Sequence, residues 1–269
     1  MNYINKLEKK IKKELEKYKP LLILTSGGAD STLLSEVAYK NISLKNFQLL
    51  HAKLPFSPIS ETKSIIEFAS TRGIKLHIIE PDLLEINEIM ENSPERCYHC
   101  KKQIISSTLK YLKNTKTVNI VDGTVCDDFT DYRPGLKATD EFAIKHPLAS
   151  CGFSKKEVRL LSRYYNLRNW NLPASACLAS RIPTNQRINV NDLKIISNAE
   201  NYLTDLGFKG CRVRCFPNQI AYIEVFPIYL SRLYRLINSI EKKLKSMGFT
   251  QVNISKNGYK KGAMNLGNK

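Results

Sequence analysis

The feature that most constrains this chain is a short apolar run followed at once by a glycine-containing turn and a helical segment. Leu21–Leu24 (Leu-Leu-Ile-Leu) is typical of a strand buried on both faces of a parallel sheet. The turn Ser26–Ser31 reads Ser-Gly-Gly-Ala-Asp-Ser, and a helix is predicted over Ser31–Lys40. A strand, a glycine turn and a helix in this order predict an α/β fold with an anion site where the helix begins.

Further strands and helices alternate along the first two thirds of the chain. Short apolar runs predict strands, and segments in which apolar residues recur with a period near 3.6 predict helices. Gly73 marks the end of one of these helices. This alternation indicates a parallel sheet with right-handed crossovers. The predicted strands are 47–52, 75–79 and 118–121, and the predicted helices are 3–18, 61–72 and 101–112.

The pattern changes after about residue 172, where the loop 171–189 carries two prolines. Helices are then predicted at 192–206 and 228–247, and strands of antiparallel type at 211–216, 221–225 and 251–255. This composition predicts a small α+β domain. We therefore expect two domains, a nucleotide-binding α/β domain over 1–172 and a C-terminal α+β domain for substrate binding or oligomerisation over 173–269.

The charge balance favours a phosphate-bearing ligand without naming it. Lys and Arg number 42 against 25 Asp and Glu, a net charge of +17, and a basic surface attracts nucleotides, RNA or membranes. Many lysines, however, lie in 6–19 among glutamates at helical spacing, as on a solvated helix face. No run nears the roughly 20 apolar residues that span a bilayer, and the N-terminus carries no apolar signal segment. We expect a cytoplasmic protein with no membrane partner, and we do not expect RNA as its ligand.

The turn itself suits a phosphate group. Gly27 and Gly28 allow the backbone to approach an anion closely, and the amides at the helix start point toward it. Ser26 and Ser31 would supply hydroxyl donors and Asp30 would help to hold Mg²⁺, while the lysine of a Walker loop is lacking. A plain glycine turn between strand and helix is the alternative. The sequence Ser-Gly-Gly-x-Asp-Ser after an apolar strand resembles the signature of the PP-loop ATP pyrophosphatases, which implies ATP and Mg²⁺ as cofactors.

Further motifs narrow the resemblance. Their joint order, over nearly the whole chain, is similar to that of the LarE family, the sulfur insertases of nickel-pincer cofactor biosynthesis. The fold implied is that of the adenine nucleotide alpha hydrolases. The motifs are Pro94-Glu95-Arg96-Cys97-Tyr98-His99-Cys100-Lys101, Asp122-Gly123-Thr124, Asp127-Asp128, Asp131–Leu136, Trp170, Pro173–Pro183, Arg212-Val213-Arg214 and Gly258–Asn265.

The resemblance implies an ATP-dependent sulfurtransferase. ATP would adenylate a carboxylate of pyridinium-3,5-biscarboxylic acid mononucleotide with release of pyrophosphate, and sulfur would then displace AMP. The partners implied are this small nucleotide, sulfide or another sulfur donor, and further copies of the chain in a homo-oligomer. Physically the reaction is a positioning problem, because sulfur must be held close to the activated acyl carbon.

Arginines are the candidates for the phosphate of the substrate. Arg212 and Arg214 match the family's arginine pair, and residues i and i+2 of a strand share a face. Two guanidiniums can grip one dianion with charge-assisted bonds, although a solvated pair of strand arginines is the alternative. Arg181 is a weaker candidate for the same pocket. The Asp127, Asp128 and Asp131 group binds Mg²⁺, orients the loop, or forms a polar turn with Arg133 as its counter-ion.

The cysteines determine the source of sulfur. In one mechanism Cys177 attacks the acyl-adenylate and gives up its own sulfur, leaving dehydroalanine. In the other, Cys97, Cys100 and Cys177 hold a [4Fe–4S] cluster whose open iron carries a labile hydrosulfide. The sacrificial mechanism needs only Cys177. The pair at Cys97 and Cys100 therefore favours the cluster.

Other interpretations stay open at this stage. The Cys-x-x-Cys pair also suits zinc, with His99 as a further ligand, or a redox dithiol. Cys211 and Cys215 form a rival ligand pair, but on a regular strand they lie about 13 Å apart. Cys126 and Cys151 receive no role beyond packing. The rival functions are a tRNA thiolase, which shares the loop and three cysteines, and a non-catalytic metal-storage or scaffold protein that keeps the fold.

Overall fold

The computed structural model describes residues 2–113, 118–171, 176–255 and 258. The chain forms two compact units, the first made of Met1–Glu85 and Glu95–Ser175 and the second of Ile86–Pro94 and Ala176–Lys269. The predicted division assigned residues 86–94 to the first domain. They belong to the second unit because Asn92 Nδ2 donates hydrogen bonds to the carbonyls of Ile182 and Pro183, at 3.1 and 2.7 Å.

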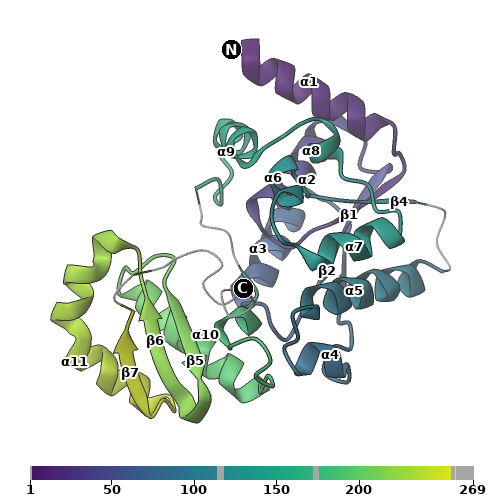
Figure 1. Cartoon of the computed structure of the whole chain (residues 1–269). Helices are drawn as coiled ribbons and strands as arrows, with labels where there is room; N and C mark the ends of the chain where they lie inside the picture. Colours follow the sequence, from purple (N-terminus) through teal and green to yellow (C-terminus); the bar gives the residue numbers. More distant parts are fainter. Residues whose placement is uncertain (1, 114–117, 172–175, 256–257, 259–269) are drawn as a thin grey trace. The chain divides into compact units, whose positions relative to one another are not determined.

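A four-stranded sheet of entirely parallel strands lies at the centre of the first unit (Figure 1). The strand order is β3-β2-β1-β4, so the order reverses between β1 and β4. Ligands of open α/β sheets bind at the carboxyl ends of the strands at such a switch point. The fold class predicted from the sequence is confirmed for this unit. The strands are β1 (Leu21–Leu24), β2 (Phe47–Ala52), β3 (Leu76–Ile79) and β4 (Asn119–Asp122).

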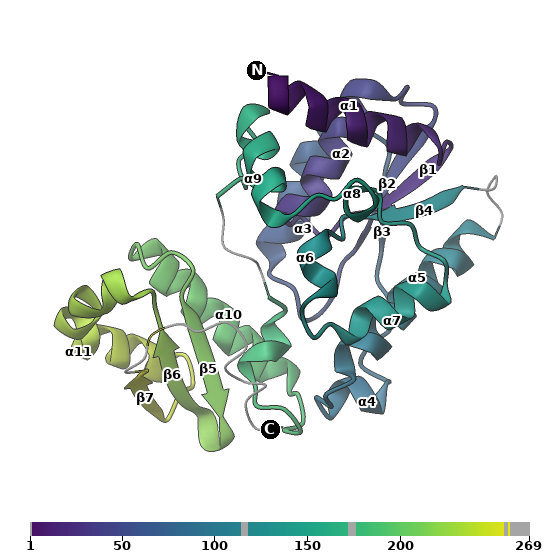
Figure 2. The same ribbon diagram turned by 45° about the horizontal axis from the view of Figure 1, so that its top comes forward.

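Helices cover both faces of this sheet (Figure 2). Leu21 and Ile23 of β1 join an apolar cluster with residues of α1, α2, α8 and α9, whereas Leu22 and Leu24 join a second cluster with residues of α5 and α7. Alternate residues of one strand therefore face opposite layers, as both faces of a parallel sheet require. The helices are α1 (Asn2–Glu16), α2 (Ala29–Asn41), α3 (Ile59–Ser70), α5 (Arg96–Leu112), α6 (Cys126–Phe129), α7 (Pro134–Glu141), α8 (Pro147–Ser150) and α9 (Lys155–Tyr164).

Two regions of the first unit differ from the sequence-based expectation. Helix α5 begins at Arg96, five residues before the predicted start, which places Cys97 and Cys100 on the helix. The segment 126–164 contains four helices that were not predicted. Three of these have eight residues or fewer, too short for a clear hydrophobic period. The fourth, α9, begins with a capping box in which Ser154 and Glu157 satisfy each other's backbone amides.

The second unit is the predicted small α+β fold. Its strands have the order β5-β6-β7; β5 and β6 are antiparallel, whereas β6 and β7 are parallel. The expectation of antiparallel strands was wrong for β7, because the chain crosses back through α11 before β7 begins. The elements are α4 (Asn87–Met90), η1 (Leu178–Arg181), α10 (Val190–Asp205), β5 (Arg212–Phe216), η2 (Pro217–Gln219), β6 (Ile220–Glu224), η3 (Pro227–Tyr229), α11 (Leu230–Ser246) and β7 (Gln251–Ile254).

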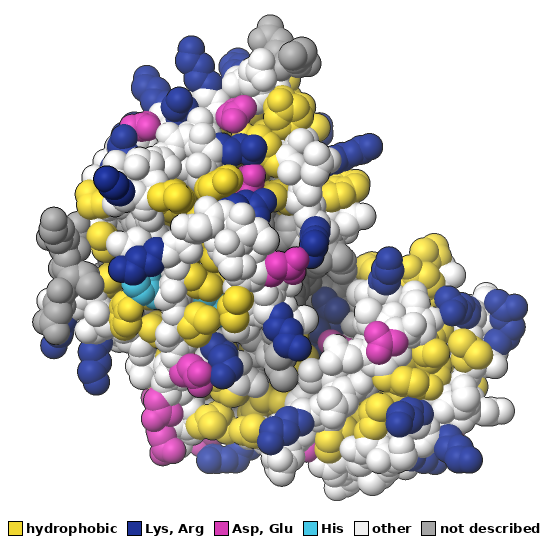
Figure 3. Space-filling view, turned by 180° about the vertical axis from the view of Figure 1, so that it is seen from behind, with side chains coloured by type: hydrophobic (Ala, Val, Ile, Leu, Met, Phe, Trp, Pro, Cys, Tyr) yellow, Lys and Arg dark blue, Asp and Glu magenta, His cyan; other side chains and the backbone are white. Residues whose placement is uncertain are grey.

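Positive charge is scattered over one face of the molecule. On the face seen in Figure 3, Lys and Arg side chains are scattered among apolar and uncharged ones. A dispersed pattern of this kind differs from the continuous basic stripe with which proteins follow a nucleic acid backbone. Over the described part of the chain, no helix combines the length and apolar character needed to cross a membrane.

Candidate nucleotide site and cysteine centres

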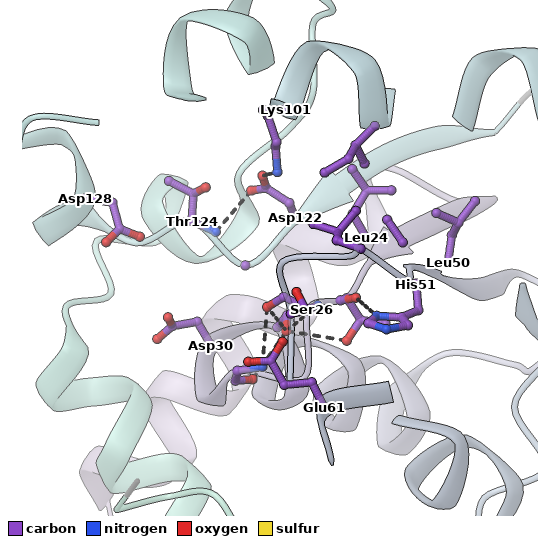
Figure 4. A pocket seen from close by; sticks show the side chains of 18 of the residues that line it. Leu24, Ser26, Asp30, Leu50, His51, Glu61, Lys101, Asp122, Thr124 and Asp128 are labelled. Carbon is purple, nitrogen blue, oxygen red and sulfur yellow. Dashed lines mark hydrogen bonds and ion pairs between the residues drawn. The ribbon is translucent and has the colours of Figure 1, made fainter. Parts of the chain in front are cut away.

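A cavity of about 280 Å³ lies at the carboxyl ends of β1, β2 and β4 (Figure 4). Four of the five loop residues predicted from the sequence line it, so the structure brings the loop to the switch point of the sheet. One part of the lining is apolar and the other is polar and charged. The apolar part includes Leu24, Leu50, Leu54 and Ile104; the polar part includes Ser26, Gly28, Asp30, Ser31, Lys101, Asp122, Thr124, Asp128 and Arg133.

The loop is held by its own hydroxyl groups. Ser31 Oγ accepts from the Ser26 amide and donates to the Gly28 carbonyl, both at 3.3 Å. The Gly28 amide donates to Ser26 Oγ at 3.3 Å. Gly27, the fifth predicted residue, has φ of 83°, a conformation that disfavours any side chain. The two serines therefore hold the loop in shape through hydrogen bonds within the loop itself.

His51, which sequence reasoning gave no role, anchors the end of β1. Its ring is buried, with Nδ1 2.9 Å from the Thr25 carbonyl and Nε2 2.9 Å from Thr62 Oγ1. A carbonyl only accepts, so Nδ1 carries a proton and donates it. Since Thr25 immediately precedes the loop, His51 fixes the point from which the loop departs.

Asp30, the predicted Mg²⁺ ligand, faces a lysine from α9. Lys155 Nζ lies 2.6 Å from Asp30 Oδ2 and 3.2 Å from Asp128 Oδ1. Burial raises the pKa of Asp30 above its ordinary value, although the Lys155 ammonium acts in the opposite direction. Among the described residues no three His, Cys, Asp or Glu side chains form a group that could hold a metal. The carboxylates of Asp30 and Asp128 are therefore both paired with the ammonium of Lys155.

A second lysine enters the cavity from α5. Lys101 Nζ lies 3.2 Å from Asp122 Oδ2, as Figure 4 shows, and His146 Nδ1 lies 2.7 Å from Asp122 Oδ1. The Thr124 amide donates to the same carboxylate at 3.0 Å. Burial by itself would raise the pKa of Asp122, but the Lys101 charge and these hydrogen bonds outweigh it and hold the pKa well below its usual range. Asp122 therefore stays ionised and orients Lys101 at the cavity wall.

Gly123 brings the two strand ends together. A Cβ atom built on it would lie 2.6 Å from the Ser31 amide nitrogen and 2.8 Å from Ser31 Cα. No real side chain tolerates backbone at that distance. The end of β4 therefore packs directly on the first turn of α2, and only glycine permits this contact.

The predicted cysteine pair lies at the start of α5. Cys97 is exposed and Cys100 is partly buried, and a guanidinium nitrogen of Arg96 lies 3.6 Å from Cys97 Sγ. Positions i and i+3 of a helix are neighbours on one face. The positive end of the helix dipole also favours negatively charged ligands there. The donor chemistry and spacing of this pair therefore suit a metal centre.

Cys177, the third predicted ligand, belongs to the second unit, where it immediately precedes η1. It is partly buried. Arg181 Nη1 donates to the carbonyls of Ala176 and Cys177, at 2.9 and 3.3 Å. The other edge of the Arg181 guanidinium forms a two-bond pair with the carboxylate of Glu200. Arg181 thus holds the backbone at Cys177, and most of its donors are used inside the protein.

The two strand arginines have different surroundings. Arg212 and Arg214 are both buried, at 7% and 6% exposure, on the same face of β5. Arg214 pairs with Glu224 at 3.0 Å and donates to the Ser180 carbonyl at 2.6 Å. Arg212 Nη1 donates to the Cys211 carbonyl at 2.8 Å. The three arginines predicted to bind the substrate phosphate therefore lie in one unit. Two of them are already paired with a carboxylate, Arg181 with Glu200 and Arg214 with Glu224.

Three of the four remaining cysteines are poor metal ligands. Burial raises the pKa of Cys151, Cys211 and Cys215 to about 11. Such thiols stay protonated near neutral pH and act as buried hydrophobes. Cys126 Sγ donates weakly to the Ala149 carbonyl at 3.5 Å. These environments oppose the rival ligand pair Cys211 and Cys215.

Sequence comparison adds relatives along most of the chain. A pyridinium-3,5-bisthiocarboxylic acid mononucleotide synthase of Lactiplantibacillus plantarum is 31% identical over 240 residues, spanning 89% of this chain and 87% of the relative. The chain belongs to the LarE family. Two further relatives are uncharacterized proteins. That of Synechocystis sp. is 33% identical over 91% of both chains, and that of Methanocaldococcus jannaschii is 32% identical over 92% of this chain and 94% of its own length. No model of a protein family matches the chain.

Several residues of this LarE-type site escaped sequence reasoning. Lys101, Asp122 and Gly123 stood in quoted motifs but received no role, although polar residues directly after a buried strand are a recognisable signal at a sheet edge. Lys155 stood in no motif. It reaches Asp30 across 125 positions of the chain, and only the packing of α9 against α2 reveals it.

The first prediction concerns pH and Asp122. We expect Asp122→Asn to lower the free energy of unfolding by about 1.5–3 kcal/mol at pH 7, because charged hydrogen bonds are lost. A depressed folded-state pKa stabilises the protein above the unfolded-state pKa of about 3.9, and this contribution disappears as the pH falls toward the folded-state value. The difference in the free energy of unfolding between wild type and variant, measured by urea unfolding, should therefore decrease from pH 7 to pH 3. Asp140→Asn, at an exposed position, is the control. A difference in unfolding free energy that does not change with pH would contradict the lowered pKa of Asp122.

The second prediction concerns Gly123. Gly123→Ala should destabilise the protein by about 1–3 kcal/mol, since the new methyl group forces the end of β4 away from α2. Gly28→Ala is the matched control for unfolding, because a Cβ there meets only Ser26 Oγ, at 3.4 Å. Thermal unfolding of both variants measures the difference. Equal unfolding temperatures would show that the two backbones are not in tight contact.

Proposed function

We propose that this protein is an ATP-dependent sulfurtransferase that converts carboxylates of pyridinium-3,5-biscarboxylic acid mononucleotide into thiocarboxylates. The observation that carries the proposal is the cavity in which the Ser26–Ser31 loop and Lys101 meet at the switch point of the sheet. Membership of the LarE family supports the same substrate, since the named relative is a synthase of the bisthiocarboxylic acid mononucleotide.

The first half-reaction activates the carboxylate. Its oxygen attacks the α-phosphorus of ATP, the bond to pyrophosphate breaks, and an acyl-adenylate forms. The loop amides and the start of α2 bind the departing pyrophosphate. Lys101, held by Asp122, balances the negative charge that grows during the transfer. The apolar wall with Leu24, Leu50 and Ile104 receives the adenine ring.

Magnesium would bind at the acidic side of this cavity. Asp30 and Asp128 place carboxylate oxygens around one cation, here the ammonium of Lys155, and such oxygens are the donors Mg²⁺ prefers. Asp30 would hold the ion together with phosphate oxygens, and the ion would neutralise the departing pyrophosphate.

The second half-reaction delivers sulfur. A sulfur nucleophile attacks the acyl carbon and AMP leaves, which gives the thiocarboxylate. Cys97, Cys100 and Cys177 would hold a [4Fe–4S] cluster, which supplies an iron with a free position for hydrosulfide. Arg181 and Glu200 hold the backbone at Cys177, and Arg212 and Arg214 bind the substrate phosphate. The alternative is sacrificial: Cys177 forms a thioester, loses its Cα proton and breaks its Cβ–S bond, leaving dehydroalanine.

The activation step is tested by product analysis. With Mg²⁺, ATP and the biscarboxylic acid mononucleotide, we expect AMP and pyrophosphate rather than ADP and phosphate. Lys101→Met should slow pyrophosphate release by about 10²–10³-fold, since it removes one preorganised charge. Lys102→Met is the control on the same helix, because Lys102 bonds to Tyr98 outside the cavity. Release of ADP, or cleavage of ATP at the same rate with and without the mononucleotide, would overturn the proposal.

The sulfur source is tested by iron and sulfide analysis of protein purified without oxygen. We expect about four irons per chain in the wild type, and a loss of iron in Cys97→Ala, Cys100→Ala and Cys177→Ala. Cys126→Ala, which alters a cysteine outside the predicted set, should retain its iron. Iron-free wild type that transfers sulfur once, with conversion of Cys177 to dehydroalanine in the mass spectrum, supports the sacrificial mechanism instead.

A further inference from the structure

The segment after α9 makes a direct contact with the phosphate loop. Asn169 Nδ2 donates to the Gly27 carbonyl at 3.2 Å and to Thr32 Oγ1 at 3.0 Å. One side chain, 142 positions from Gly27 along the sequence, therefore links the loop to the first turn of α2. The neighbouring Trp170 is stacked under the guanidinium of Arg163 at 5.2 Å, which fixes the segment against α9.

The orientation of this amide follows from its partners. The Gly27 carbonyl only accepts hydrogen bonds, so the group that faces it is the NH₂ of Asn169. Both amide hydrogens then have acceptors, whereas Oδ1 is buried with no hydrogen-bond partner. An unpaired buried oxygen is unfavourable, and an apolar side chain at this position would avoid it. The amide is therefore explained by its two donors and not by packing.

The carbonyl that Asn169 binds controls an amide of the loop. The Gly27 carbonyl and the Gly28 N–H belong to one trans peptide, in which the two bonds point in opposite directions. Gly28 lines the cavity, whereas Asn169 does not. Holding the carbonyl on Asn169 thus fixes the orientation of this peptide, whose Gly28 N–H donates to Ser26 Oγ at 3.3 Å on the other side. Gly27, with φ of 83°, supplies the conformational freedom that makes such a fixation necessary.

We propose that Asn169 is a positioning residue that fixes the Gly27–Gly28 peptide for binding the pyrophosphate part of ATP. The proposal rests on the proposed function, which supplies ATP as the ligand. It predicts an effect on ligands that carry the pyrophosphate part and little effect on AMP, because the adenine ring would contact the apolar wall of the cavity. A residue with a merely structural role would weaken the binding of every ligand alike.

The test measures dissociation constants by calorimetry for MgATP, magnesium pyrophosphate and AMP. Asn169→Asp keeps the shape but loses both donors and places a carboxylate against the Gly27 carbonyl. We expect at least tenfold weaker binding of MgATP and pyrophosphate, and less than twofold change for AMP. Asn171→Ala, two residues further along at an exposed position, should bind all three ligands like wild type.

A second variant covers the case in which Asn169→Asp does not fold. Thr32→Val removes one acceptor of the amide and should show the same pattern with a smaller effect. In Asn169→Ala, adding Thr32→Val should cause no further loss, because the shared contact is already gone. Equal weakening for AMP and pyrophosphate, or unchanged MgATP binding, would overturn the role of Asn169 alone. Wild type that binds neither MgATP nor pyrophosphate would overturn the proposed function as well.

Discussion

The candidate nucleotide site depends on one close contact between two backbones, where Gly123 at the end of β4 meets Ser31 at the start of α2. This contact closes the switch point of the sheet without any intervening side chain. The residues on either side of Gly123 then serve the cavity, since Asp122 orients Lys101 and Thr124 directs its amide to the same carboxylate. A larger residue at 123 would separate the loop from the charges that complete the site.

Buried and partly buried carboxylates arrange the cations of both units. In the first unit, Asp122 holds Lys101, while Asp30 and Asp128 hold Lys155. In the second unit, Glu200 pairs with Arg181 and Glu224 with Arg214. Removing one partner of a buried pair leaves an uncompensated charge, so each carboxylate also fixes its cation in place. The net charge of +17 therefore matters at the site through a few oriented groups and not through the dispersed surface lysines.

Local pattern predicted the central strands well, because each is a short apolar run bounded by turns. Strands β1 and β2 have the predicted bounds, and β3 and β4 differ by one residue at each changed end. The start of α5 was missed because the polar stretch Arg96–Lys101 shows no apolar period. Helix α9 begins with a capping box at Ser154, which is a local signal for a helix start. The parallel pairing of β7 could not be read locally, since strand direction within a sheet depends on the crossover.

The sequence by itself determined the α/β class and the family, and it predicted the phosphate loop and the cysteine set, because each depends on residue order or local periodicity. Tertiary structure decided which distant groups complete the site. Lys155 and Asn169 reach the loop from 125 and 142 positions away, and Glu200 holds Arg181 and thereby the backbone at Cys177. These partners meet only after the helices pack on the sheet, and a local pattern carries no information about which side chains will then share a hydrogen bond.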